Sequence, residues 1–91
     1  MNYEESKVFE KALTTYGFES QTKMLLEEMS ELTKAMCKYW RGKRNLEEIA
    51  EEMADVQIML DQMTLLFQNH GLQQQYRLEK IERLRQRLEG G

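Results

Sequence analysis

Apolar side chains recur at intervals of three and four residues along most of this 91-residue chain, and this spacing restricts it to α-helices. Proline is absent, and only five glycines interrupt the pattern. Many of the other residues are Glu, Leu, Met, Lys, Arg and Gln, all of which favour helices. We therefore predict an all-α fold.

Four helices are expected, each separated from the next by residues that favour helix ends. Gly17 and Gly42 end the first two, because glycine readily adopts the backbone conformations found after a helix C-terminus. Asn45 is a favoured N-cap residue, and Glu48 follows it at the spacing of a capping box. The expected helices cover about residues 4–16, 19–40, 46 to a stop near His70-Gly71, and 73–88.

The second and third expected helices share one apolar rhythm, with steps of four and three residues. Their connection, Arg41 to Arg44, is short enough to make them antiparallel neighbours. We predict a core formed by this helical hairpin, flanked by the other two helices. The predicted stripes are Leu25, Met29, Leu32, Met36 and Tyr39, then Ile49, Met53, Val56, Leu60, Met63 and Phe67, with Phe9, Leu13 and Tyr16 in the first helix and Leu78, Ile81, Leu84 and Leu88 in the fourth.

Size and composition exclude several classes of protein. A chain of 91 residues buries only a modest core, so we expect a homodimer or homotetramer. Cys37 is the only cysteine and His70 the only histidine, which excludes an internal disulfide and a His-rich metal site. No membrane span or signal peptide is recognisable, so a cytoplasmic protein is expected. The net charge of −3 argues against broad nucleic-acid binding, although the last helix is basic.

A six-residue pattern occurs twice, twenty-four residues apart. Residues 27–32 read EEMSEL and residues 51–56 read EEMADV, which is acid, acid, Met, small, acid, aliphatic in both cases. In a heptad register with Leu25 and Leu32 at d, Glu28 and Glu52 take the g positions, and Glu31 and Asp55 take the c positions. Residues three apart share a helix face, and the g flanks of antiparallel helices are adjacent. All four carboxylates should therefore converge on one side of the hairpin.

Four converging carboxylates raise one another's pKa and oppose folding unless a cation compensates them. Mg²⁺ and Mn²⁺ are hard ions that prefer carboxylate and water oxygens, and they often bind substrate phosphates as well. The pattern therefore predicts a divalent-metal site. The alternative is that these acids are ordinary solvated positions in a chain with 14 glutamates.

The acidic pattern, with its surrounding apolar residues from about Phe18 to Phe67, resembles the EExxE and ExxD signature of the MazG-like all-α nucleoside triphosphate pyrophosphohydrolases. The resemblance implies one MazG-like helical domain over residues 1–91. It also implies Mg²⁺-dependent cleavage of NTP or dNTP between the α and β phosphates, giving the monophosphate and pyrophosphate. By this resemblance Glu28, Glu31, Glu52 and Asp55 bind the metal. Glu27 holds or activates the attacking water, or has only a surface role.

Substrate contacts are predicted from local position, because the segment that binds phosphate in longer relatives is short here and neither Asn69 nor Lys80 can be aligned with it. Lys38, and more weakly Lys34, lie within reach of a phosphate bound at the acids; the alternative is that they are surface lysines or partners of Glu48 and Glu52. Trp40 is a candidate for stacking on the base or for a subunit interface, whereas Tyr39 is expected in the core.

Two other functions remain open at this stage. A non-catalytic helical adaptor would use the seven methionines as an adaptable surface for partner helices. A weaker alternative uses the basic tail, from Arg77 to Glu89, to contact nucleic acid.

Overall fold

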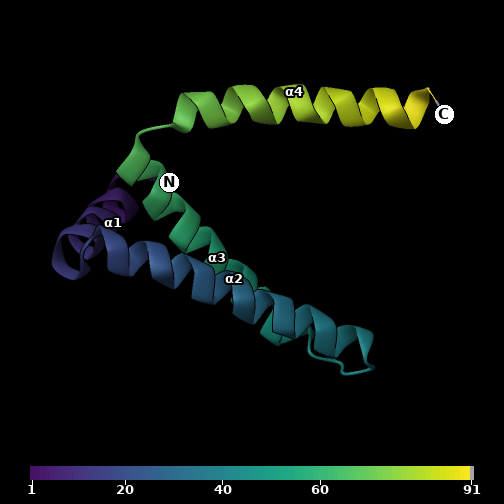
Figure 1. The fold of residues 1–91 in the computed structure, drawn as a ribbon, viewed down its shortest axis with the longest axis horizontal. Coiled ribbons are helices and arrows are strands. Elements are labelled where there is room, and N and C mark those ends of the chain that lie inside the picture. Colours follow the sequence, from purple (N-terminus) through teal and green to yellow (C-terminus); the bar gives the residue numbers. More distant parts are fainter. Residues whose placement is uncertain (91) are drawn as a thin grey trace.

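The structure is a computed structural model that describes residues 1–90, and within that range its regular elements are all helices, with no strand (Figure 1). This confirms the predicted all-α fold and the number of helices. The four helices are α1 (Tyr3–Tyr16), α2 (Phe18–Trp40), α3 (Leu46–Phe67) and α4 (His70–Glu89).

Two glycines make the sharp turns between the first three helices. Gly17 separates α1 from α2 with φ 94°, and Gly42 lies in the α2–α3 connection with φ 98°. Side chains avoid this part of backbone space, so glycine is required by the backbone itself at both positions. The predicted helix ends at Gly17 and Gly42 are confirmed.

The predicted end of the third helix, near His70 and Gly71, is wrong. α3 ends at Phe67 because Gln68 adopts a left-handed conformation, with φ 50° and ψ 46°. α4 then begins at His70, where the Asn69 carbonyl accepts the backbone N–H of Gln73 at 2.9 Å. Gly71 is thus inside the first turn of α4 rather than at a stop.

The predicted capping box between Asn45 and Glu48 does not form. Asn45 is the N-cap of α3, but its side chain makes no capping hydrogen bond. Its Nδ2 instead donates to the Ala35 carbonyl across the hairpin, at 3.0 Å, while Glu48 faces Lys38. Both side chains therefore make contacts with α2 instead of the local hydrogen bonds of a capping box.

The core lies where α2 and α3 run antiparallel and side by side, with α1 packed against both at the end away from the Gly42 turn (Figure 1). Ala35 is completely buried, so the two helix backbones approach closely there. The other buried side chains are Phe9, Leu13, Met59 and Met63, together with the amides Gln21 and Gln62.

Half of the predicted hairpin stripe is exposed, which corrects the expected core. Ala35 and Met59, each one position away from the stripe, are buried, whereas Met29, Met36, Met53, Leu60 and Phe67 of the stripe are exposed. Tyr39, expected in the core, is 43% exposed. Seven exposed apolar residues form what we call the apolar hairpin face: Leu26, Met29, Met36 and Trp40 on α2, and Met53, Leu60 and Phe67 on α3.

α4 extends away from the other helices (Figure 1) and has no buried residue. Its link to the rest of the chain includes a hydrogen bond from Gln73 Nε2 to Thr64 Oγ1, at 3.0 Å. None of the helices in residues 1–90 combines the length and apolar character needed to cross a membrane. The predicted dimer or tetramer stays a prediction.

Candidate metal centre

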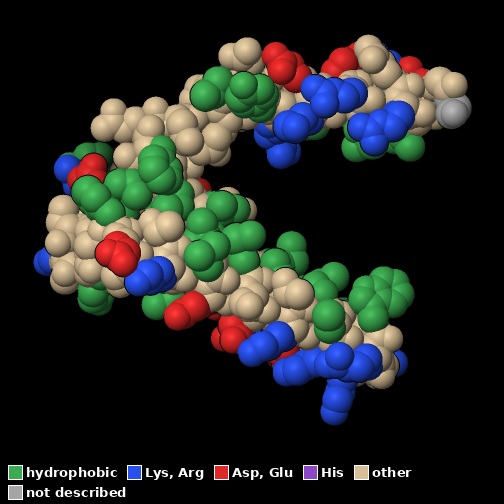
Figure 2. Space-filling model, in the orientation of Figure 1, with side chains coloured by type: hydrophobic (Ala, Val, Ile, Leu, Met, Phe, Trp, Pro, Cys, Tyr) green, Lys and Arg blue, Asp and Glu red, His purple; other side chains and the backbone are tan. Residues whose placement is uncertain are grey.

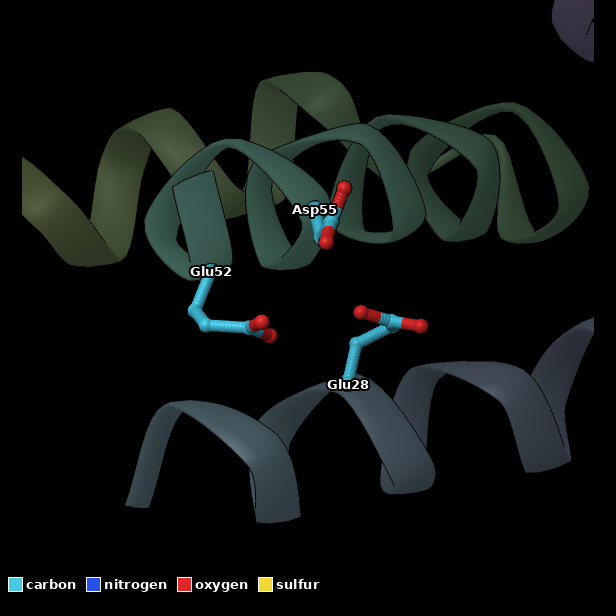
Figure 3. Close-up of side chains that lie close together, drawn as sticks. All are labelled: Glu28, Glu52 and Asp55. Carbon is cyan, nitrogen blue, oxygen red and sulfur yellow. The ribbon is translucent and has the colours of Figure 1, made fainter. Parts of the chain in front are cut away.

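Three carboxylates from two helices meet on one side of the hairpin. Glu28 extends from α2 toward Glu52 and Asp55 of α3, as Figure 3 shows. One oxygen from each side chain lies within 4.8 Å of the other two. Glu52 and Asp55 share a face because they are three residues apart on one helix, and the antiparallel pairing brings Glu28 opposite them.

The environment of these acids opposes their ionisation. Burial raises the pKa of Glu28 above its ordinary value, and the negative charge of Asp55 raises it further. Burial also raises the pKa of Glu52, with added repulsion from Asp55 and Glu31. Burial and the neighbouring negative charges both favour the neutral acid over the carboxylate. A bound cation would therefore be strongly favoured here.

No ion pair within residues 1–90 supplies that charge to the three acids. In addition, the Oε2 atom of Glu52 is buried without a hydrogen-bond partner. A buried acceptor without a partner is unfavourable unless something binds it. The unpartnered oxygen is an independent sign that the site is built for a ligand.

The donor set fits a hard divalent cation. All three ligands are carboxylates, which Mg²⁺ and Mn²⁺ prefer over nitrogen or sulfur donors. Metal–oxygen distances of about 2.1–2.4 Å place opposite ligands about 4.2–4.8 Å apart. The observed limit of 4.8 Å between oxygens therefore allows one ion to contact all three side chains after small adjustments.

Glu31, the predicted fourth ligand, lies at the edge of this cluster rather than within it. Its Oε1 is 3.5 Å from Lys34 Nζ, and the side chain is exposed. Its charge nevertheless contributes to the raised pKa of both Glu28 and Glu52. The structure thus brings three of the four predicted acids together and leaves the fourth nearby, paired with a lysine.

Three other predicted site residues, Glu27, Lys34 and Lys38, are exposed on α2. Glu27 is exposed and lines an open groove with Glu28 and Glu31. Lys38 Nζ is 3.3 Å from Glu48 Oε1, so both candidate lysines have carboxylate partners in this structure. The assignment of each of these residues to a metal or substrate role stays a prediction.

Trp40 is not brought to the carboxylates. It lies twelve residues beyond Glu28 on α2, about 18 Å along the helix axis. Its side chain is 80% exposed, with the Tyr39 ring edge-on at 5.7 Å. Trp40 belongs to the apolar hairpin face, and its two expected roles, base stacking and a subunit interface, both stay predictions.

Two buried glutamine side chains near the acids were not predicted from the sequence. Gln21 is seven residues before Glu28, and Gln62 is seven residues after Asp55, so they continue the same polar row between α2 and α3. The Oε1 atom of Gln62 has no hydrogen-bond partner. The heptad spacing that located the acids also contained these glutamines, but glutamine in a helix gives no distinctive signal.

Comparison with known proteins agrees with this site. The profile of a family described as phosphoribosyl-ATP pyrophosphohydrolase matches residues 2–85, nearly the whole chain. No curated protein and no solved structure matches the chain. The matched family is part of the MazG-like all-α NTP pyrophosphohydrolase superfamily, so the resemblance seen in the acidic pattern holds at that level. The chain therefore belongs to the phosphoribosyl-ATP pyrophosphohydrolase family.

Proposed function

We propose that this chain is a Mg²⁺-dependent pyrophosphohydrolase that cleaves a nucleotide between its α and β phosphates. The products are the corresponding monophosphate and pyrophosphate. The observation that carries this proposal is the convergence of Glu28, Glu52 and Asp55, with an unpartnered buried oxygen on Glu52, in a chain of this family. The enzyme class is a hydrolase acting on acid anhydrides.

In this proposal Glu28, Glu52 and Asp55 hold Mg²⁺, or Mn²⁺ in its place, and Glu31 joins them when it leaves Lys34. A divalent ion bound there would neutralise phosphate charge and lower the pKa of a coordinated water. Glu27, at the rim of the groove, orients the attacking water and accepts its proton. Attack at the α phosphorus expels pyrophosphate as the leaving group.

Lys34 and Lys38 bind the phosphate chain by exchanging their present partners for phosphate oxygens. Each lysine now pairs with an exposed or half-buried carboxylate, Glu31 or Glu48. Such surface pairs contribute about 0–1 kcal/mol, so a triply charged phosphate chain displaces them readily. Stacking of the base on Trp40 stays a separate prediction, because Trp40 lies far along α2 from the acids.

The substrate class is a nucleotide with a triphosphate chain. An NTP or dNTP is the prediction from the acidic signature, and the family's name adds phosphoribosyl-ATP, which carries the same chain. The catalytic acids act on the phosphates that these compounds share. The base, the sugar and the added phosphoribosyl group thus have to be distinguished by experiment.

The test is to measure products from a panel of NTPs, dNTPs and phosphoribosyl-ATP, with and without Mg²⁺. We expect pyrophosphate in one piece, only with metal, from at least one of them. Glu28→Gln should lower turnover by at least about 100-fold, since losing a metal ligand removes several kcal/mol of charge stabilisation.

The matched control is Glu5→Gln on α1. Its side chain accepts a hydrogen bond from Asn2 at the start of α1, which glutamine preserves, and it lies outside the acidic cluster. Its activity should equal that of the unmodified chain. Release of single phosphates would contradict the proposed reaction, and no turnover of any substrate would favour the helical adaptor.

A further inference from the structure

Basic side chains gather at the turn that joins α2 to α3. Arg41, Lys43 and Arg44 lie within four residues of one another, and all three are exposed. We call these three residues the basic tip. Figure 2 shows Lys and Arg side chains clustered at this end of the hairpin, next to a row of acidic side chains along its edge. The chain as a whole carries −3, so the tip holds +3 on a protein whose other residues sum to −6.

The positive charge of the basic tip has no partner in this structure. None of its three residues takes part in an ion pair within residues 1–90. Glu47 and Glu48 follow in the first turn of α3, but Glu48 pairs with Lys38 at 3.3 Å, and no ion pair joins Glu47 to the tip. Three cations this close repel one another, so a bound anion is favoured there.

Backbone hydrogen bonds hold the turn in one conformation. The N–H of Lys43 donates to the Lys38 carbonyl at 3.1 Å, and the N–H of Gly42 donates to the Tyr39 carbonyl at 3.0 Å. This is the Schellman pattern of a helix C-terminus, and Gly42 supplies its left-handed residue with φ 98°. The cations are therefore presented from a fixed backbone, which lowers the entropy lost when a ligand binds.

A shallow hollow borders this turn, lined by Tyr39, Gly42, Lys43, Arg44 and Leu46. Two of these side chains are cations. A guanidinium can hold two phosphate oxygens at once, and an ammonium adds a compact positive charge. The aromatic ring and the leucine offer an apolar surface on which the carbon face of a sugar ring can pack. The lining therefore suits a sugar phosphate better than a bare inorganic anion.

The hollow is separate from the metal centre, but it lies on the same hairpin. Leu46 is six residues before Glu52 on α3, about 9 Å along the helix axis. A sugar and a base can bridge a separation of this order, whereas a phosphate group alone cannot. ATP has phosphates at one end only. Phosphoribosyl-ATP, as its name states, adds a second ribose that carries its own phosphate.

We propose that the basic tip and its hollow form a second anion site, which binds the phosphate of a ribose phosphate group. When the triphosphate chain of a substrate lies at the metal centre, the tip holds a phosphate on a second ribose of the same molecule. The link to the substrate rests on the proposed function, whereas the anion site itself does not. ATP lacks the second phosphate and does not engage the tip.

Fluorescence titration of the metal-free chain with ribose 5-phosphate tests the anion site without any turnover. Trp40 is the only tryptophan, and its ring lies 5.7 Å from that of Tyr39, which lines the hollow. We expect a saturable change in Trp40 emission with ribose 5-phosphate and none with ribose. An emission that does not respond at millimolar ribose 5-phosphate would overturn the proposal.

The double variant Lys43→Gln/Arg44→Gln should raise the Kd for ribose 5-phosphate at least about 10-fold, because two hydrogen bonds from charged donors are lost. The matched control is Lys7→Gln/Lys11→Gln, which removes the same charge from exposed positions on α1. Its Kd should stay within a few-fold of that of the unmodified chain. An equal rise in both variants would mean that only the net charge matters and would contradict a site at the tip.

Steady-state kinetics assigns the bound phosphate to the substrate. The Lys43→Gln/Arg44→Gln variant should raise KM for phosphoribosyl-ATP at least about 10-fold, leave kcat within a few-fold, and leave both constants for ATP unchanged. An equal rise in KM for both substrates would show that the tip binds the triphosphate chain and would overturn the assignment. If neither compound is hydrolysed, the proposed function fails, and the fluorescence titration still decides the anion site.

A short oligothymidine without terminal phosphates separates a ribose phosphate site from a nucleic-acid surface. Cations beside an exposed aromatic ring also suit single-stranded nucleic acid. A site for one phosphate monoester should bind the oligonucleotide more weakly than ribose 5-phosphate. Tighter binding of the oligonucleotide, with an affinity that falls steeply as salt rises, would overturn the proposal in favour of nucleic acid.

Discussion

At the scale of single residues, the carboxylates of the metal centre destabilise the protein that carries them. Glu28 and Glu52 are half-buried beside Asp55, and the pKa of each is raised by burial and by its acidic neighbours. Placing such groups on two packed helices has a cost in folding free energy. A bound cation would offset this cost by neutralising the carboxylates, and metal binding would then explain why the acids are placed there.

We predict that Mg²⁺ or Mn²⁺ raises the melting temperature. At a metal concentration about ten times the dissociation constant, binding to the folded state alone contributes about 1.4 kcal/mol. For a domain of this size that corresponds to a rise of about 6–11 °C. Glu52→Gln and Asp55→Asn should remove most of the rise while keeping the helix content measured by circular dichroism. A melting temperature that ignores both metals would count heavily against the metal centre.

The raised pKa values predict the pH dependence of the metal-free protein. A carboxyl whose pKa is higher in the folded state than its ordinary value of 4.5 favours folding below that value, and this contribution is lost as pH rises through the folded pKa. Glu28→Gln removes the penalty of the ionised form. In EDTA it should therefore melt at a higher temperature than the unmodified chain at pH 7, with the advantage disappearing near pH 4. An equal difference at both pH values would refute the electrostatic cause.

At the scale of helices, three interruptions fix where each element points. Gly17 and Gly42 turn the chain with positive φ, and Gln68 does the same between α3 and α4 without being glycine. The two glycines allow α1 and α3 to lie against α2. Gln68 directs α4 away from them, so a single left-handed residue decides that α4 has no buried side chain.

We predict opposite effects for two glycine-to-alanine changes. Gly17→Ala should lower the free energy of unfolding by about 1–3 kcal/mol, because a Cβ is strained at φ 94° although no atom lies within 4 Å of it. Gly71→Ala should raise it by about 0.5–1 kcal/mol, since Gly71 is helical and has open space around it. Urea unfolding midpoints at one protein concentration measure both. A harmless Gly17→Ala would mean that the α1–α2 turn relaxes to another conformation.

At the scale of the whole molecule, the hairpin separates two functions onto two surfaces. The acids lie on the contact between α2 and α3 and open to one side, while Met29, Met36, Met53 and Leu60 face elsewhere. The apolar surface is free to bind another chain without covering the metal centre. We therefore expect substitutions on the apolar surface to leave metal binding unchanged.

We predict that the melting temperature rises with protein concentration. If folded chains associate and unfolded chains do not, association stabilises the folded state by mass action. Calorimetry of the chain at about 1 µM and about 100 µM should show the difference. A melting temperature independent of concentration would indicate a stable monomer.

The helices and the converging acids could be predicted from the amino-acid sequence. Local propensity, apolar spacing and the glycine positions predict four helices, because these signals act over a few residues. The repeated pattern and a short connection were enough to place Glu28, Glu52 and Asp55 on one side of an antiparallel hairpin, since heptad geometry relates both helices.

The rotation of each helix about its own axis could not be predicted, because it depends on packing between helices. That rotation put Ala35 at the closest approach, exposed Tyr39 and Met53, and left Glu31 with Lys34 at the edge of the cluster. Side-chain choices such as Asn45 bonding Ala35 instead of capping α3 were decided there too. They depend on contacts between distant residues and compete by about 1 kcal/mol, a difference that local spacing does not contain.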